Sequence, residues 1–258
     1  MRNKFFDIKL LKLWGVIILI IVWWLIKLVF FNGTNFLPSP GETFAKVMEL
    51  FITGSILADI SSTLKQFGVG FGIAAIFGIP LGLILGFSKR GYAAFEIVLD
   101  FFRSIPVTAL FPLFILFFGI GSSTIIAMVT VACFFVILIN SAYGVIYVNK
   151  TYLVVMDSLK STWFQKFTEV IFYEALPFLF IGLRVAVSFG LIVVVVSEMF
   201  IGSEFGLGSR VYKAYETYLI TEVYALTIII GLLGYFLNKI ILILEKKVVH
   251  WKGNITAN

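Results

Sequence analysis

The sequence is poor in charged residues. Asp, Glu, Lys and Arg make up 13% of its 258 residues, and hydrophobic residues make up 60%. An ordinary soluble domain carries roughly a quarter charged residues. A soluble fold of this length could not bury so much apolar surface, which predicts a chain embedded in lipid. No polar segment is long enough for a separate soluble domain, so we expect one membrane domain over residues 1–258.

Cysteine and histidine are nearly absent, and so are the motifs of enzymes. The only cysteine, Cys133, excludes an internal disulfide, and the only histidine, His250, lies far from it in sequence. There is no metalloprotease, serine-hydrolase or phosphate-loop motif. Carboxylates inside the apolar runs, on which ion-coupled carriers depend, are scarce. The sequence therefore predicts no metal site, no catalytic residue and no means to drive uphill transport without a partner.

Six apolar segments approach the roughly 20 residues that a helix needs to cross the hydrocarbon core of a bilayer. They are residues 13–31, 60–87, 106–119, 124–148, 177–201 and 222–244. The third is short and begins at Pro106. By itself it also fits a re-entrant segment, and Phe101 and Phe102 can extend it. The predicted fold is an all-α, polytopic membrane helix bundle with about six transmembrane helices.

Lysine and arginine are distributed unevenly between the connections. With the N-terminus inside, fourteen of them lie in cytoplasmic stretches, Arg103 included, and four in external stretches. The positive-inside rule then predicts that both termini are cytoplasmic, and it accounts for the formal charge of +6 without nucleic acid. The basic start, the long apolar run and the lack of a small-residue cleavage site predict a retained first helix rather than a signal peptide.

Glycine and proline mark the expected turns and contacts. Pro38 and Pro40 predict an external turn, and residues 42–53 have the apolar spacing of a short helix on the outer surface. The external loop 202–221 holds Gly202, Gly206 and Gly208. The second span carries two sets of glycines spaced by four, which predict close approach of a neighbouring helix. These are Gly68 and Gly72, and Gly78, Gly82 and Gly86.

The longest predicted cytoplasmic segment, residues 149–176, has the pattern of two short helices. Val155 and Leu159 share one face of the first helix. Thr162 and Gln165 fit a capping box that begins the second, which is expected to end where Pro177 starts the fifth span. Two interpretations stay open: a hairpin folded on its own bundle, or a docking element whose apolar tip enters a groove on another subunit.

The order of these features resembles the permease subunits of bacterial ABC importers, in the nitrate, sulfonate, taurine and bicarbonate group. The resemblance covers about residues 37–252. It rests on LPSP at 37–40, RSIPVTALFPLFILFFGIG at 103–121, SEMFIGSEFGLG at 197–208 and a coupling loop at 157–177 that ends in Ala-Leu-Pro. It implies a type I ABC importer permease fold with a cytoplasmic coupling helix within residues 149–176.

The resemblance also implies partners. They are a second permease copy in a homodimer, cytoplasmic ATPase subunits that bind ATP and magnesium, and an extracellular or periplasmic substrate-binding protein. This chain would hold no cofactor and would be a multi-pass protein of the cytoplasmic (inner) membrane. The solute would be a small anion such as nitrate, a sulfonate, taurine or bicarbonate, or a cofactor precursor. The competing hypotheses are a stand-alone carrier or channel and, third, a membrane-embedded enzyme.

The resemblance places contacts with the ATPase at the tip of the first cytoplasmic helix. The expected coupling residues are Val155, Met156, Asp157, Ser158, Leu159 and Lys160. The sequence departs from the family here, because Val154, Val155 and Met156 replace Glu-Ala-Ala and Lys160 replaces a glycine. A glycine suits a left-handed helix cap, and a lysine in that conformation costs about 1 kcal/mol. Under the alternative interpretation, Asp157 and Lys160 are solvated charges.

Four residues are expected to line the translocation pathway or its gate. They are Arg103, Pro106, Glu198 and Met199. For Arg103 the alternative is a basic anchor at the cytoplasmic start of the third span. For Glu198 the alternative is to cap or pair with a neighbouring helix. Pro106 and Pro112 are expected to bend the third span.

Overall fold

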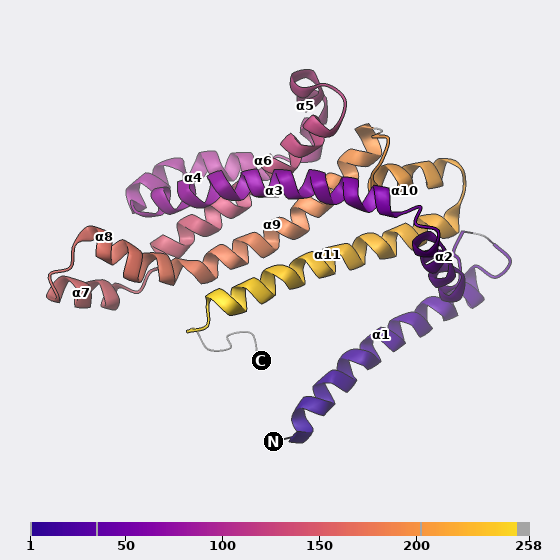
Figure 1. Cartoon of the computed structure of the whole chain (residues 1–258), viewed down its shortest axis with the longest axis horizontal. Coiled ribbons are helices and arrows are strands. Elements are labelled where there is room, and N and C mark those ends of the chain that lie inside the picture. The colour runs from indigo at the N-terminus through magenta and orange to yellow at the C-terminus, as the bar shows by residue number, and fades with distance from the viewer. Residues whose placement is uncertain (1, 35, 202, 252–258) are drawn as a thin grey trace.

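The computed structural model describes residues 2–34, 36–201 and 203–251, with side chains from residue 14 onward. Gly202 of the predicted external loop and residue 252, at the end of the resemblance, lie outside these residues. All regular structure in the described residues is helical. The long helices α3, α6, α9 and α11 run lengthwise through an elongated bundle (Figure 1). They are α1 (Arg2–Phe30), α2 (Pro40–Ile52), α3 (Leu57–Gly86), α4 (Lys89–Ser104), η1 (Val107–Leu110), α5 (Phe111–Phe118), α6 (Ser122–Ile146), α7 (Lys150–Ser158), α8 (Trp163–Lys166), the π-turn η2 (Phe167–Ile171), α9 (Phe172–Ile201), α10 (Leu207–Glu216) and α11 (Ile220–Val248).

The predicted all-α membrane bundle is confirmed. Among the described residues, α3, α6, α11 and the continuous helix Trp163–Ile201 are each long and apolar enough to span a membrane. The apolar stretch Trp14–Phe30 of α1 is shorter. The remaining candidate for a crossing is a pair of helices, Lys89–Ser104 and Val107–Phe118, which are apolar enough together but are bent by 76°, as in a broken span or a re-entrant loop.

The third crossing differs from its prediction. It begins with α4 at Lys89 rather than at Pro106, and it breaks where the predicted span was to start. Ile105 has the extended backbone that a following proline imposes, with φ −76° and ψ 120°. Pro106 also lacks the N–H that would continue the helix. The sequence prediction placed this segment in a cytoplasmic connection because α4 contains charged residues.

The core lies where α3, α6 and α9 meet. A Cβ at Gly82 would lie 2.3 Å from the Leu138 carbonyl oxygen, and one at Gly86 would lie 2.6 Å from that of Ala142. The glycine face predicted for Gly78, Gly82 and Gly86 is therefore confirmed as a close contact with α6. The same prediction is wrong for Gly68 and Gly72, because a Cβ built at either position would have no neighbouring atom within 4 Å in the described part of this chain.

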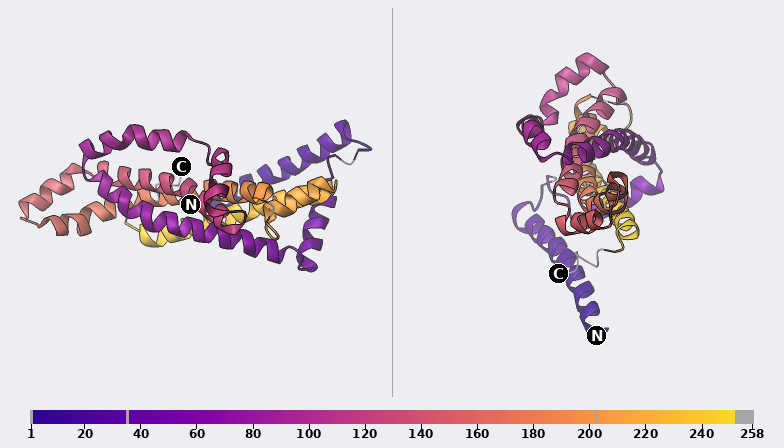
Figure 2. Two further views of the ribbon diagram at one scale, coloured as in Figure 1. Left: turned by 90° about the horizontal axis from the view of Figure 1, so that it is seen from above. Right: turned by 90° about the vertical axis from the view of Figure 1, so that its left-hand side faces the viewer.

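The two ends of the bundle carry different elements. α7 and α8 form one end, and α2, with the turn from α10 to α11, forms the other (Figure 1). α1 begins and α11 ends toward the α7–α8 end, while α1 slants away from the other helices (Figures 1 and 2). The short helix predicted near residues 42–53 is confirmed as α2. It starts with a capping box in which the Ser39 backbone N–H donates to Glu42, which lowers the pKa of that carboxyl.

Two non-glycine residues in the described chain adopt the left-handed backbone conformation, Lys160 (φ 54°) and Tyr218 (φ 56°). Each follows the last turn of a short helix and closes the same pattern of bonds. After α7, Lys160 N–H donates to Asp157 O and the next amide donates to Met156 O, at 2.9 and 3.0 Å. After α10, Tyr218 N–H donates to Tyr215 O at 3.1 Å. The left-handed form costs roughly 1–2 kcal/mol for such residues, and glycine would avoid this cost.

Candidate functional site

The break between α4 and η1 opens onto a cavity of about 500 Å³. The cavity is lined by the break itself, by Val131–Asn140 in the middle of α6, and by Val185–Val193 in the middle of α9. Arg103 and Pro106 therefore lie about halfway along the bundle. This corrects the expectation that Arg103 stands at the cytoplasmic start of the third span. Sequence reasoning failed here because it did not recognise α4 as part of the crossing.

Polar side chains enter this mostly apolar cavity at a few places. Arg103, Ser104 and Thr108 come from the break, and Asn140 comes from α6. The Asn140 amide donates to the Val136 carbonyl oxygen at 2.8 Å, so its side-chain oxygen can still accept. The combination of an apolar wall with few polar groups is typical of a site that binds a small solute.

Arg103 forms an ion pair with Asp100, one turn earlier in α4. The Nη2–Oδ1 distance is 3.0 Å, and the side chains are 56% and 54% exposed in the single chain. Charged side chains at the middle of a bilayer face protein or water, because exposure to hydrocarbon is costly. By this argument we expect protein or water, rather than lipid, to face this side of α4.

A smaller cavity of about 310 Å³ follows farther along α9. Its walls include Ala109, Phe111 and Pro112 from the third crossing, and Val196–Phe200 from α9. Thr108 of η1 lines both cavities. The 3₁₀ turn η1 thus lies between two cavities that follow one another along the bundle. A constriction of a pathway would be expected at such a position.

Glu198, another predicted pathway residue, is fully buried at the end of α9. Three successive backbone amides before and in the first turn of α10 donate to side chains of α3 and α9. Gly206 donates to Asp59 at 3.0 Å, Leu207 to Thr63 at 2.9 Å, and Gly208 to Glu198 at 2.9 Å. The Thr63 hydroxyl also donates to the Glu198 carboxylate, at 2.8 Å to Oε1.

Through these contacts Glu198 caps the N-terminus of α10 from a neighbouring helix. This is the alternative role, capping or pairing with a neighbouring helix, that the sequence left open. Its side chain satisfies an amide that the helix itself leaves free. The glycines are required, because a Cβ at Gly206 would lie 2.5 Å from the Glu198 carboxyl carbon and one at Gly208 would lie 2.0 Å from Val195 O. Met199 is partly buried in the next position. A direct role of Glu198 or Met199 in the pathway stays a prediction.

Arg184 of α9 pairs with Glu245 of α11 at 3.4 Å. It lies fourteen residues before Glu198 in the same helix, which is too far for those two side chains to pair. Asp59 and Thr63 were also missed, although polar residues at a spacing of four in the first turns of an apolar helix were a usable signal. Asp100 and Asn140 were missed together with the course of α4.

The coupling segment forms the predicted helical hairpin. α7 carries Val155, 51% exposed, and the residue after its end, Leu159, is 69% exposed. Met156 is partly buried, and Ser158 is exposed. Asp157 pairs with Lys166, which ties the two arms together. The capping box of Thr162 and Gln165 is confirmed.

The second arm of the hairpin holds it on the bundle. Phe167 packs on Phe87 at the end of α3, with ring centroids 5.5 Å apart, and Ile171 is buried against Val148. The expectation that the fifth span starts at Pro177 is wrong. Helix runs from Trp163 to Ile201 through the π-turn η2, with Pro177 inside it. One arm therefore packs on the bundle, as the first interpretation predicts, and the tip exposes apolar side chains. Docking of this tip on another subunit stays a prediction.

Comparison with known proteins identifies the family. The family described as the binding-protein-dependent transport system inner membrane component matches residues 78–250. The chain belongs to this family. NrtB, the nitrate import permease of Synechocystis sp., is 30% identical over 244 residues, which cover 91% of this chain and 87% of NrtB. TauC, the taurine transport system permease of Escherichia coli, is 26% identical over 243 residues, covering 92% and 88%.

The fold agrees with this membership. A chain of the MetNI methionine ABC transporter in an inward-facing conformation matches with a TM-score of 0.63 and 20% sequence identity. The match covers 74% of this chain and 95% of the other. The resemblance stated from the motifs is thus confirmed, as are the type I importer permease fold and the function as a permease subunit of an ABC importer. The permease is a multi-pass membrane protein.

The strained cap at Lys160 gives a testable consequence for this permease. Lys160→Gly should relieve the left-handed strain by about 1 kcal/mol. Amide hydrogen exchange in α7 should then slow by about fivefold, since exchange reports the free energy of local opening. Lys160→Ala, which keeps the strain and removes the charge, is the matched control. Faster exchange in the glycine variant would contradict the assigned cap.

Proposed function

We propose that the two cavities at the third crossing belong to the translocation pathway, and that the chain works as a homodimer whose second copy faces α4, η1 and α5. The observation that carries this proposal is the Arg103–Asp100 pair, charged and more than half exposed midway along the bundle. Lipid does not accommodate such a surface. A second copy and a solute pathway between the two copies would cover it.

The proposed solute is a small anion. Arg103 supplies a permanent positive charge at the cavity, and Asp100 holds it when no solute is bound. NrtB is named as a permease for nitrate, an anion, and TauC as a permease for taurine, whose sulfonate group carries a negative charge. A solute anion could replace Asp100 as the partner of the Arg103 guanidinium. Such a site would bind the anion weakly enough to release it, as a translocation pathway requires.

The proposed energy source and partners lie outside this chain. Cytoplasmic ATPase subunits would bind ATP and magnesium, and an external binding protein would deliver the solute. The chain itself would be non-catalytic and without a cofactor. The α7–α8 end, with Lys150, Lys160 and Lys166, is assigned to the cytoplasm of the inner membrane, as the positive-inside rule favours. The α2 end would then be external, and both termini cytoplasmic.

Docking of the ATPase at the hairpin tip is tested with Leu159→Asp. Co-expressed with the ATPase from the neighbouring genes, the wild-type chain should copurify with it. The aspartate variant should lose it, because a charge replaces an apolar side chain that would enter a groove. Leu219→Asp, at a comparably exposed leucine on the opposite end, should retain the ATPase. Retention by both variants would contradict the docking site.

The alternative of a stand-alone carrier or channel is tested with the purified chain alone. In liposomes loaded with nitrate or taurine, we expect no solute flux and no ATP hydrolysis. Flux through this chain without an ATPase would overturn the proposed function.

A further inference from the structure

Tyr218 presents its side chain in an unusual way at the turn between α10 and α11. Its left-handed backbone, where glycine is the usual residue, is strained, and the side chain is 80% exposed. Its side chain makes no hydrogen bond and no ring contact with the other described residues. Backbone hydrogen bonds close the turn, but no contact of the phenol side chain adds to them. Residues held in such conformations are found at functional sites more often than elsewhere.

Tyr218 borders a cavity of about 290 Å³ at this end of the molecule. The cavity lies between α2 and the turn, and its walls are Lys46, Tyr218, Leu219, Ile220, Thr221 and Glu222. Leu219 is 53% exposed. An exposed aromatic and an exposed aliphatic side chain thus stand beside a hollow whose rim includes a cation and an anion.

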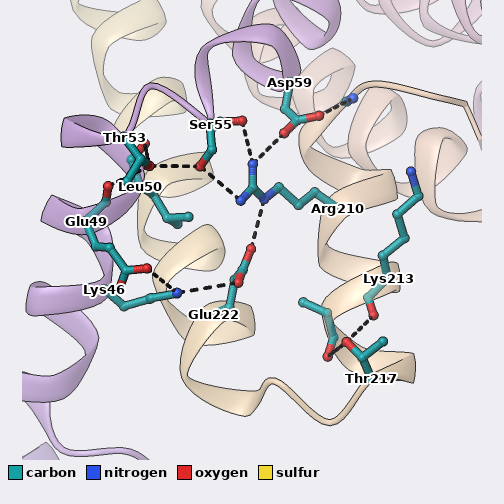
Figure 3. A network of polar contacts seen from close by, with 12 residues as sticks. Lys46, Glu49, Leu50, Thr53, Ser55, Asp59, Arg210, Lys213, Thr217 and Glu222 are labelled. Carbon is teal, nitrogen blue, oxygen red and sulfur yellow. Dashed lines mark hydrogen bonds and ion pairs between the residues drawn. The ribbon is translucent and has the colours of Figure 1, made fainter.

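The charged wall of this cavity is held by a network that joins four helices (Figure 3). Arg210 of α10 donates to Glu222 of α11 at 2.9 Å and to Asp59 of α3 at 3.0 Å. Burial opposes the charge of Arg210, but these hydrogen bonds outweigh it and raise the pKa of the guanidinium. Lys46 of α2 lies 3.9 Å from Glu222 and 2.8 Å from Glu49. The cavity is therefore preformed.

We propose that Tyr218 and this cavity form the docking surface for the external substrate-binding protein, with Tyr218 as its central anchor. The inference rests on the proposed function, which places this end outside the cell. A rigid aromatic side chain at low entropic cost, next to a preformed hollow with a charged rim, is the arrangement of an interface hot spot. The family depends on a binding protein. Lipid fits less well, because Lys46 and Glu222 line the same hollow.

The test separates the side chain from the backbone. Tyr218→Gly and Tyr218→Asn both suit the left-handed turn, so the permease should fold at least as well as the wild type. The permease–ATPase complex is placed in nanodiscs, and binding of the purified binding protein from the neighbouring genes is measured. We expect at least a tenfold loss of affinity in both variants, with basal ATP hydrolysis and thermal stability unchanged or raised. Tyr235→Asn, at an aromatic residue 60% exposed on α11, is the control and should bind as the wild type does.

The outcomes distinguish this inference from the proposed function. If the wild-type chain assembles with the ATPase and responds to the binding protein, but both Tyr218 variants bind it equally well, the docking surface is overturned. Tyr218 then belongs to the lipid headgroup layer. If the wild type neither assembles with an ATPase nor binds the binding protein, the proposed function fails first.

Discussion

Replacing Glu198 with alanine is expected to lower the free energy of unfolding by about 3–5 kcal/mol. The variant leaves Gly208 N–H without its acceptor and removes both acceptors of the Thr63 hydroxyl. It also leaves a cavity at a fully buried position. A buried donor without a partner costs more than a typical hydrogen bond contributes. Unfolding of the detergent-solubilised protein, followed by circular dichroism, measures the loss.

Two further variants separate the acceptor from the charge. Glu198→Gln keeps one acceptor oxygen and should lose only about 1–2 kcal/mol. Gly208→Ala keeps the carboxylate but forces a Cβ against Val195 O, and it should disrupt the same contact between α9 and α10. If the Glu198→Ala variant is as stable as the Glu198→Gln variant, capping of α10 is not the main role of Glu198. Its predicted contact with the pathway would then be favoured.

Replacing Arg103 with glutamine is expected to reduce import of the anionic solute by ten- to a hundredfold. A hydrogen bond to a charged group contributes about 1.5–3 kcal/mol, and each 1.4 kcal/mol is about tenfold in affinity or rate. Arg103→Lys keeps the charge and should retain part of the activity. Import of nitrate and of taurine is measured in proteoliposomes that contain the ATPase and the binding protein.

Assembly of the transporter is the control for the two Arg103 variants. Copurification with the ATPase and stimulation by the binding protein should match the wild type in both variants, because Arg103 is distant from the hairpin tip. Asp100→Asn should retain import, since it frees the guanidinium rather than removing it. Full import by the glutamine variant would contradict the proposed contact between Arg103 and the solute.

Some features could be predicted because they depend on residues close together in the chain. Long apolar runs predicted α3, α6 and α11 to within a few residues, and the end of α9 at Ile201, since a helix satisfies its own backbone in lipid. The capping box of Thr162 and Gln165 spans four residues. The motif from Ser197 to Gly208 was noticed as a unit, although its partners were unknown. α4 was missed because hydropathy treats its charges as signs of an aqueous connection.

By itself, the sequence determined that this chain is an all-α membrane bundle and to which transporter family it belongs. Only the tertiary structure decided that Arg103 stands halfway along the bundle, beside Asn140 and α9. It also decided that the Glu198 carboxylate accepts a hydrogen bond from the Thr63 hydroxyl, 135 residues earlier in the chain. The physical reason is range: hydropathy and capping act within a few turns, whereas the partner of a buried polar group is chosen by how whole helices pack.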